Sequence, residues 1–367
     1  MKKIIILSPT LWSEPKRLRR QLAELLAKNM EVIYITLPFA FRNPEKTGEE
    51  SHDRVRVVNL AGPNFPLRII LSSRSMRFFY CLKLKWEIKK IIPSISQADV
   101  IFSFVYSYPE LLRLAPNAKK IYVANDDHSA IATSRKFQKT IKEHEFETIS
   151  LCDAILSVSK NIAKKFESLK KPSYLMYPGH DCVPLPVSQF KLSEVGLRSA
   201  CFMGFIDWRI DFKLIRRLLE QGWSVTFFGP VIGTEDHIKA LSRDFEKSFF
   251  VKDSIDTRNA STVLSKYQIL IMPYKFRSHE QRDAIELPNK VFIYFSALRP
   301  VIATFMPNLQ FVSPGLIYME TPGLNFIDLC TIAIEDDNSN YIAARYHLAS
   351  NNTWDSRIEY IDEIIND

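Results

Sequence analysis

Glycine is scarce in this sequence, with 10 glycines among 367 residues. A dinucleotide-binding domain needs the pattern GxGxxG after its first strand, because the backbone must touch a pyrophosphate there. The turn SPTLWSEPKRLRR, residues 8–20, contains no glycine, and the phosphate-binding pattern GxxxxGK(S/T) occurs nowhere in the chain. The sequence therefore argues against NAD-dependent enzymes and against P-loop nucleotide hydrolases.

Cysteine pairs and long apolar runs are also missing. The 5 cysteines are scattered and form no CxxC pair, so neither a disulfide framework nor a zinc site is indicated, and we expect a reducing cytoplasm. No apolar run approaches the roughly 20 residues that are needed to cross a bilayer. The run from Ile4 to Leu7 ends at Ser8 without a small-residue cleavage site, which favours a buried strand over a signal peptide.

Short apolar segments alternate with amphipathic segments along the whole chain. This pattern predicts parallel sheets that are covered by helices on both faces. The expected strands are 3–7, 31–36, 55–58, 99–104, 119–123, 153–158, 173–177, 199–203, 223–228, 248–251, 268–272, 300–304 and 315–319. The expected helices are 14–29, 74–92, 134–150, 159–168, 211–221, 235–245, 259–266, 288–298 and 354–365.

The pattern restarts near residue 199, after a proline-rich stretch. We therefore predict an α/β protein with two doubly wound domains, at 1–190 and 191–350, followed by a terminal segment at 351–367 that contains a helix. Ligands bind such sheets at the carboxyl ends of the strands. The net charge of +8 indicates nucleic acid, an anionic membrane or a phosphorylated ligand as the partner.

The segment YVANDDHSA brings polar groups to the end of an expected strand. Asp126, Asp127 and His128 are candidates for a general base that takes a proton from an acceptor hydroxyl. The alternative is an Asx turn that caps the following helix. A metal site is not expected, because the chain offers no companion cluster of ligands.

The first expected turn offers hydroxyl groups and an aromatic ring in place of glycine. Ser8, Thr10, Trp12 and Ser13 are residue types that suit an acceptor or a sugar. The alternative is that Ser13 only caps the helix that follows it.

Two expected strand ends in the second half of the chain carry a glycine. Gly204 lets a ligand approach the backbone closely, and Arg209 is a candidate clamp for a diphosphate. Gly229 stands where the wall of a base pocket is commonly found. The alternative for Arg209 is a solvated charge at a helix entrance.

The strongest local signal is PYKFRSHEQRDAIELPNKVFIYFSALRP, residues 273–300. It begins at a strand end and continues into a polar loop that contains Glu286. Pro288 fits the first turn of a helix, which would leave the amides of Asn289 and Lys290 at the positive end of the helix dipole. With the charge of the lysine, this predicts an anion site that a diphosphate would complete. The alternative is a solvated loop.

With these segments in this order, the sequence resembles the GT-B glycosyltransferases, and among them the GT4-type enzymes of bacterial surface-polysaccharide assembly. The residues that match the family's donor-site segment are Pro288, Asn289, Lys290, Tyr294, Ala297, Pro300 and Val301. FMG at 202–204 is similar to the start of the family's second domain. LCDAILSVSKNIAKKF is similar to a segment of its first domain, and NNTWDSRIEYI at 351–361 to the terminal helix, which crosses back onto the first domain in this fold.

The resemblance implies a UDP- or GDP-linked sugar as donor, bound mainly by the second domain without a metal or another cofactor. Arg209 and Lys290 would hold the diphosphate, Glu286 would contact the sugar, and the first domain would bind the acceptor. The implied donor-binding residues are Gly204, Arg209, Gly229, Tyr274, Glu286, Pro288, Asn289 and Lys290. Ile293 replaces the glutamate with which the family grips the ribose, and whether transfer retains or inverts configuration stays open.

Positive charge is concentrated in residues 65–92, where Glu87 is the only acid. Aromatic residues interleave with the basic ones, which is typical of a helix that lies in a membrane interface. A lipid-linked acceptor at an anionic cytoplasmic leaflet would explain this composition. The candidate acceptor and membrane contacts are Trp12, Arg74, Arg77, Lys83, Lys85 and Trp86. The alternative is a core helix with a basic outer face, and no nucleic-acid-binding module is recognised.

We therefore predict a cytoplasmic, peripherally membrane-bound, metal-independent glycosyltransferase. It would move a sugar from a nucleotide to a lipid-linked or growing saccharide in capsule, exopolysaccharide or lipopolysaccharide synthesis. A nucleotide-sugar epimerase of the same architecture is an alternative, although it would need no acceptor surface. An inactive nucleotide-sugar sensor or scaffold is another, because Ile293 stands in the ribose position.

Overall fold

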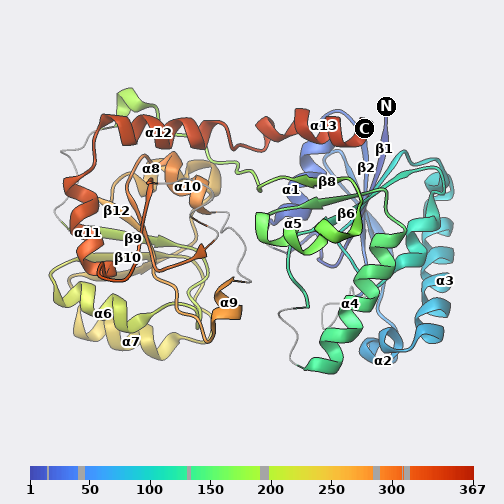
Figure 1. The fold of residues 1–367 in the computed structure, drawn as a ribbon, viewed down its shortest axis with the longest axis horizontal. Coiled ribbons are helices and arrows are strands. Elements are labelled where there is room, and N and C mark those ends of the chain that lie inside the picture. Colours follow the sequence, from blue (N-terminus) through green and yellow to red (C-terminus); the bar gives the residue numbers. More distant parts are fainter. Residues whose placement is uncertain are drawn as a thin grey trace. The chain divides into compact units, whose positions relative to one another are not determined.

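The computed structural model describes residues 1–14, 16–39, 46–129, 134–190, 198–283, 290–307, 309 and 315–367. The chain divides into two compact units, one formed by Met1–Pro178 with Arg357–Asp367 and the other by Gly179–Ser356 (Figure 1). The predicted boundary at residue 190 lies inside the second unit. The reason is that the segment after Pro178 hydrogen-bonds to that unit: His180 donates its backbone N–H to Asn352 and Leu185 donates to Ser296.

The first unit contains an eight-stranded sheet in the order β3-β4-β2-β1-β5-β6-β7-β8. All neighbouring strands are parallel except β3 and β4, which are antiparallel. The strands are β1 Lys3–Ser8, β2 Glu31–Thr36, β3 Gly48–His52, β4 Val55–Asn59, β5 Val100–Ser103, β6 Lys119–Ala124, β7 Ala154–Ser157 and β8 Ser173–Leu175. The helices are α1 Leu18–Leu26, α2 Leu67–Ser72, α3 Arg74–Ile91, α4 Arg135–Ser150, α5 Lys160–Phe166 and α13 Ile358–Asn366.

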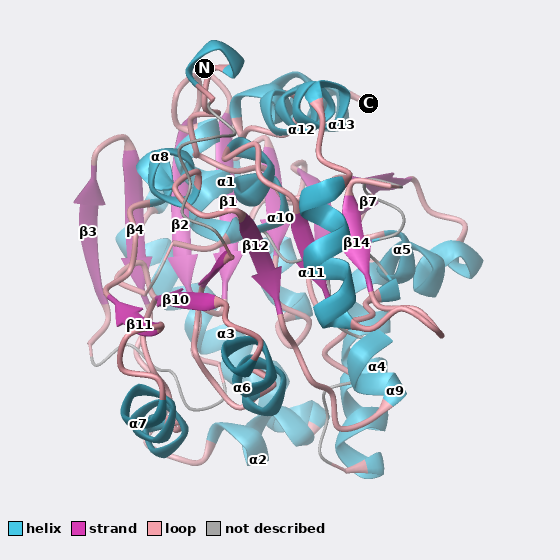
Figure 2. Cartoon of the chain, turned by 90° about the vertical axis from the view of Figure 1, so that its left-hand side faces the viewer, coloured by secondary structure: helices cyan, strands magenta, loops and turns pink. Residues whose placement is uncertain are grey.

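The second unit contains a six-stranded parallel sheet in the order β11-β10-β9-β12-β13-β14. Its strands are β9 Ser199–Met203, β10 Ser224–Phe228, β11 Phe249–Lys252, β12 Ile269–Met272, β13 Val301–Ala303 and β14 Ile317–Met319. Its helices are α6 Phe212–Glu220, α7 Glu235–Asp244, α8 Ala260–Leu264, α9 His279–Asp283, α10 Lys290–Ser296, α11 Phe326–Glu335 and α12 Ser339–Ser350. Figure 2 shows α11 against β14, and α11 also contacts β12 and β13.

The central strands form because they are apolar on both faces. Ile4, Ile5 and Ile6 of β1 are fully buried, as expected for a strand covered by helices on both sides. Helix α6 instead buries one face, and Asp211 caps it by accepting hydrogen bonds from the backbone N–H groups of Lys213 (3.0 Å) and Leu214 (3.1 Å).

In each sheet the strand order reverses its direction next to the strand that comes first in the chain, which is β1 in the first unit and β9 in the second. The order in the second unit places this switch point between β9 and β12, where open α/β sheets bind ligands. The predicted fold class, with two Rossmann-like doubly wound domains, is confirmed.

The buried side chain of Arg345 ties α12 both to the segment that precedes this helix and to the turn after α10. The side chains of Arg345 and Asp337 are 1% and 3% exposed, and they form a salt bridge. The Nε of Arg345 also donates to the carbonyl of Leu298 at 3.0 Å. Leu298 has a φ of 62°, so this turn holds a non-glycine residue in the left-handed region.

We expect Arg345→Met to lower the free energy of unfolding by about 3–5 kcal/mol, because it leaves the Asp337 carboxylate buried without its partner. Urea denaturation of the purified protein measures the change. As a control, Arg243→Met removes an ion pair whose arginine is 79% exposed, and should leave stability nearly unchanged. The double variant Arg345→Met/Asp337→Leu should recover most of the loss, and a single variant as stable as the native protein would contradict this account.

Candidate functional site

Two glycines bring three elements of the second unit together at the carboxyl end of β9. Gly204 has a φ of 140°, and a Cβ atom there would lie 2.5 Å from the Nζ of Lys290. Gly229, at the end of β10, also has a φ of 140°, and its Cβ would lie 2.2 Å from the carbonyl oxygen of Gly204. Any side chain at either position would push these groups apart. Glycine is therefore required at these two positions, where two strand ends and Lys290 meet.

Lys290 is the first described residue of α10, and its ammonium lies against aromatic side chains. The Nζ atom is 4.1 Å from the ring centre of Phe202 and donates a hydrogen bond of 2.6 Å to the hydroxyl of Tyr274. Desolvation, assisted by the positive charge of Arg209, lowers the pKa of Lys290 to about 7, and the Asp207 carboxylate opposes the shift. An anion bound here would hold the lysine in its charged form.

Arg209 is not a solvated charge at a helix entrance. Its Nε donates to both carboxylate oxygens of Asp207, at 2.9 and 3.1 Å, and its Nη2 donates to one of them at 2.6 Å. These hydrogen bonds raise the pKa of Arg209. The side chain of Arg209 remains 37% exposed, and its guanidinium carbon lies 6.0 Å from the ring centre of Tyr274. The two cations and Tyr274 thus form one cluster beside Gly204.

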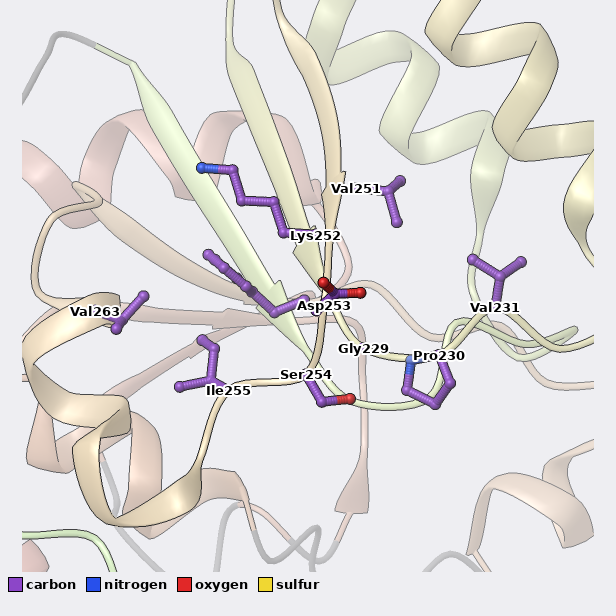
Figure 3. A pocket seen from close by; sticks show the side chains of 10 residues that line it. Gly229, Pro230, Val231, Val251, Lys252, Asp253, Ser254, Ile255 and Val263 are labelled. Atoms are coloured by element: carbon purple, nitrogen blue, oxygen red, sulfur yellow. The ribbon is translucent and has the colours of Figure 1, made fainter.

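A cavity of about 860 Å³ opens beside this cluster. Its lining comes from the ends of β10 and β11 and from α8 (Figure 3). The lining residues are Phe228, Gly229, Pro230, Val231, Val251, Lys252, Asp253, Ser254, Ile255 and Val263. The pocket is open on one side, and its volume lies in the range of clefts that bind small organic ligands. Because Gly229 lines the cavity and touches Gly204, the cavity and the cation cluster adjoin at these two glycines.

Part of the predicted donor site lies outside the described residues. Glu286, Pro288 and Asn289 lie outside the described residues, so the predicted helix-dipole anion site stays a prediction. The described residues of α10 show a structural role for Tyr294. Its hydroxyl accepts a hydrogen bond from the backbone N–H of Met203 (2.8 Å) and donates one to the carbonyl of Ile271 (3.3 Å), which joins α10 to β9 and β12.

In the first unit, Asp126 follows the end of β6 and faces an arginine from α1. The Nη2 of Arg19 donates to the amide oxygen of Asn125 (3.2 Å) and lies 3.8 Å from a carboxylate oxygen of Asp126. Although 44% of the Asp126 side chain is exposed, desolvation of its carboxyl raises its pKa, and Arg19 opposes this shift. Arg19 was not singled out in the sequence, although it lies on the buried face of its helix.

Asp127 has a structural role, because its carboxylate is held by hydrogen bonds. Its Oδ1 accepts hydrogen bonds from the backbone N–H (3.1 Å) and hydroxyl (2.7 Å) of Ser129, and from the Nζ of Lys165 (3.0 Å). Lys165 also donates to Glu145 at 2.7 Å, and Glu145 accepts from the hydroxyl of Tyr122 at 2.9 Å. This series of hydrogen bonds joins β6, α4 and α5. The Asx turn considered as the alternative is therefore present at Asp127, whereas Ser134 caps α4.

His128 lies among aromatic rings. Its ring centre is 5.0 Å from that of Tyr106 and 6.3 Å from that of Phe39. Burial, together with the positive charges of Arg19 and Lys165, lowers the pKa of His128 to about 4. The imidazole is thus neutral at pH 7 and able to accept a proton or a hydrogen bond.

The structure corrects the prediction for two of the acceptor and membrane contacts. Arg77 is 1% exposed and forms an ion pair with Glu147 of α4, because the helical period turns residue 77 inward with Tyr80 and Leu84. Trp12 is only 6% exposed, since its ring packs edge-on against Tyr34. Neither side chain can contact a membrane surface or present an open face to an acceptor.

The other predicted contacts on α3 do reach the surface. Arg74 is exposed, and 57% of the Lys83 side chain and 63% of Trp86 are accessible. Lys85 is partly exposed. Large apolar residues on α2 and α3, and just before α2, are exposed as well. They are Phe65, Ile69, Met76, Phe78, Phe79 and Leu82. We call this surface the α2–α3 surface.

The described residues lack two further features. None of the helices in the described ranges is both long and apolar enough to span a bilayer. Among the same residues, no group of three or more histidine, cysteine, aspartate or glutamate side chains is arranged to hold a metal ion.

Comparison with known proteins gives one curated relative and many similar structures. No family model matches the sequence. The chain is 23% identical over 373 aligned positions to the "putative teichuronic acid biosynthesis glycosyltransferase TuaH" of Bacillus subtilis, covering 92% of this chain and 89% of the relative.

Several solved structures share the fold. The HepE protein of Anabaena in complex with UDP superposes with a TM-score of 0.68 at 13% identity, with 100% of both chains covered. An α,α-trehalose-phosphate synthase (UDP-forming) from Burkholderia vietnamiensis gives a TM-score of 0.66 at 10% identity, covering 100% of this chain and 97% of that one. A trehalose-6-phosphate structure from E. coli, bound with UDP-2-fluoro glucose, gives 0.64 at 11% identity, covering 99% of each chain. The expected resemblance to GT-B glycosyltransferases is confirmed.

Proposed function

We propose, on the premise of this shared GT-B fold, that the protein is a glycosyltransferase. It takes a sugar from a UDP-sugar and transfers it to a saccharide or lipid-linked acceptor in the assembly of a bacterial cell-surface polysaccharide. The named relative in teichuronic acid biosynthesis supports the pathway class, and the UDP complexes of the similar structures support the nucleotide. One observation carries the proposal: a ligand-sized cavity adjoins a cluster of two cations across the Gly204–Gly229 contact.

In this proposal the two halves of a UDP-sugar match the two halves of the site. The cavity receives the nucleoside, and Lys290 and Arg209 bind the diphosphate. The planar guanidinium of Arg209 suits paired phosphate oxygens, and the compact ammonium of Lys290 adds a point charge. These cations take the place of a metal ion in stabilising the charge on the leaving diphosphate, so we propose that transfer needs no metal.

The first unit supplies the acceptor-side groups in this proposal. During transfer, the acceptor hydroxyl oxygen bonds to the anomeric carbon, and the bond between that carbon and the diphosphate oxygen breaks. UDP leaves with the electron pair, and the hydroxyl proton passes to a base. Asp127 is held by Lys165 and Ser129, which leaves Asp126 and His128 as the candidate bases. We assign the base to Asp126, because its carboxylate is accessible.

A nucleotide panel tests the donor assignment. We expect UDP and a UDP-sugar to raise the midpoint of thermal unfolding, because a ligand that binds only the native state stabilises it, by about 2.7 kcal/mol at a hundredfold excess over the dissociation constant. GDP and CMP serve as matched controls and should shift the midpoint less. Equal midpoints with all three nucleotides and without ligand would overturn the proposed function.

We also propose that the protein binds the cytoplasmic face of the membrane peripherally, through the α2–α3 surface. Exposed rings such as Phe79 and Trp86 suit the headgroup region, and Lys90 lies 5.5 Å from the ring centre of Trp86. The exposed lysines of this surface add attraction to anionic lipid of about 1 kcal/mol each. A lipid-linked acceptor would be presented at such a surface.

We expect Phe79→Ser and Trp86→Ser each to weaken vesicle binding about tenfold or more, because each removes roughly 1.5–3 kcal/mol of apolar burial. Cosedimentation with phosphatidylglycerol-containing vesicles measures the partition coefficient. Phe146→Ser is the matched control, because Phe146 is 62% exposed but lies on α4 among glutamates. Equal effects of all three substitutions, or equal binding to vesicles without anionic lipid, would contradict the proposal.

An inactive nucleotide-sugar sensor is the second candidate. Ile293, which stands where the resemblance places a ribose-binding glutamate, is 7% exposed and offers no polar group. A sensor would bind UDP-sugar without releasing UDP when acceptor lipid is added. Release of UDP that depends on an acceptor would exclude it.

A further inference from the structure

Asp207 is an acid at the centre of a site that is otherwise built for an anion. It lies in the loop between β9 and α6, and its side chain is only 13% exposed. Besides the guanidinium of Arg209, its Oδ1 accepts the backbone N–H of Arg209 at 3.0 Å. A carboxylate so close to a diphosphate site would repel the ligand, so its presence calls for a physical role.

The contacts of Asp207 fix one edge of Arg209. Two guanidinium nitrogens, Nε and Nη2, are occupied by the carboxylate. Within the described part of the chain, Nη1 forms no hydrogen bond or ion pair, and the side chain stays 37% exposed. The loop itself is held to the neighbouring strand end, because Lys275 donates its backbone N–H to the carbonyl of Arg209 at 2.7 Å and Asp211 donates to Pro273 at 2.8 Å.

Asp207 also acts on Lys290. Lys290 reaches the same cluster through its hydrogen bond to Tyr274, whose ring lies near the guanidinium of Arg209. Arg209 and Lys290 repel each other electrostatically, and the negative charge of Asp207 offsets that repulsion. Without Asp207, two cations would face each other in a largely desolvated place before any ligand arrives.

We infer that Asp207 is a positioning residue of the donor site: it holds Arg209 by one edge and offsets the repulsion between Arg209 and Lys290, so that both cations are available to a diphosphate. This inference rests on the proposed function. It concerns a residue that does not itself touch the ligand, and it explains why an acid is tolerated beside an anion site.

The pH dependence of UDP binding separates this role from a merely structural one. The described titratable and charged groups that act on Lys290 are Asp207, Arg209 and Cys201, with Tyr274 in direct contact. Burial raises the pKa values of Cys201 and Tyr274, and hydrogen bonds hold Arg209 charged and Asp207 ionised. Near neutral pH, therefore, Lys290 is the group in this cluster that titrates.

The sign of the effect follows from the pKa of Lys290, which is about 7 in the free protein. Bound diphosphate favours the ammonium, so the contribution of Lys290 to binding is full below pH 7 and is lost as the pH rises through that value. Asp207→Asn removes the charge that opposes the lowering, so the pKa of Lys290 falls further. The variant should lose affinity at a lower pH than the native protein.

The experiment measures the dissociation constant of UDP by calorimetry from mildly acidic to mildly alkaline pH. Because UDP itself has a phosphate that titrates near pH 6, the ratio of variant to native dissociation constants is compared at each pH, and the titration of the ligand cancels. For Asp207→Asn we expect this ratio to rise with pH, by about tenfold if the pKa of Lys290 shifts by one unit. Asp207→Glu, which keeps the charge, should give a ratio that is nearly independent of pH.

Two further measurements make the result unambiguous. In a Lys290→Met background, Asp207→Asn should give a flat ratio, because the titrating group is gone. Asp207→Ser replaces the asparagine variant if that variant does not fold. A flat ratio for the neutral variants in the presence of Lys290 would overturn the inference, whereas failure of the native protein to bind UDP at any pH would overturn the proposed function instead.

Discussion

Lys290→Ala is expected to weaken UDP binding by about 10- to 100-fold, because hydrogen bonds to a charged group contribute roughly 1.5–3 kcal/mol. The effect on kcat/KM should be larger, about 10²- to 10³-fold, since negative charge grows on the diphosphate as the glycosidic bond to it breaks. Binding is measured by calorimetry with UDP, and turnover by the release of UDP from a UDP-sugar.

Loss of the native fold is not the expected cause of the weaker binding. The Lys290 ammonium lies on the rings of Phe202 and Tyr274, where desolvation disfavours its charge. Removing a charge from such a place should leave the thermal midpoint unchanged or slightly higher. Lys213→Ala, on the exposed face of α6, is the matched control and should bind UDP like the native protein. Native-like turnover in Lys290→Ala would remove the electrostatic basis of the proposal.

Asp126→Asn is expected to lower kcat by about 10²- to 10⁴-fold, which is the usual contribution of a general base. The dissociation constant of UDP should change little, because the proposed donor-binding groups belong to the other compact unit. Single-turnover kinetics with saturating UDP-sugar measures the chemical step. In the native protein the rate should rise with pH as the Asp126 carboxyl, whose pKa is raised, loses its proton.

Asp127→Asn is the contrasting variant. It removes the negative partner of Lys165 and Ser129, so we expect a loss of stability of about 1–3 kcal/mol, with kcat retained in the folded protein. His128→Ala tests the remaining candidate. If His128→Ala abolished turnover while Asp126→Asn retained it, the assignment of the base to Asp126 would be wrong.

Arg77 and Trp12, which were predicted as acceptor or membrane contacts but are buried, were misjudged for different reasons. Arg77 could have been placed correctly, because it recurs with Tyr80, Leu84 and Ile88 at the spacing of a helix face. Its charge concealed that pattern, since a buried arginine is uncommon without a partner, and the partner Glu147 lies far along the chain. Trp12 had no such signal, because its packing against Tyr34 and His52 depends on the sheet.

Several helices and one strand of the structure were not predicted from the sequence. Strand β3, with the sequence GEESH, is an exposed, polar edge strand, so it carries no apolar alternation. Helix α2 spans only six residues and lies directly before α3. The helices α11 and α12 were not predicted, although α11 is apolar and capped by Asn325. The cap of the first helix by Ser13, which was the alternative considered for that residue, is not observed, because α1 begins at Leu18 after Arg17.

The sequence by itself determined the two α/β domains, because apolar period and turn residues are local properties of the chain. It also determined that Gly204, Arg209, Tyr274 and Lys290 follow or precede strands of one sheet, since the carboxyl ends of parallel strands share an edge. Only the tertiary structure decided how these residues interact. The pairing of Arg209 with Asp207, the desolvation of Lys290 by Phe202 and the contact of Arg19 with Asn125 depend on distances between segments that local pattern does not encode.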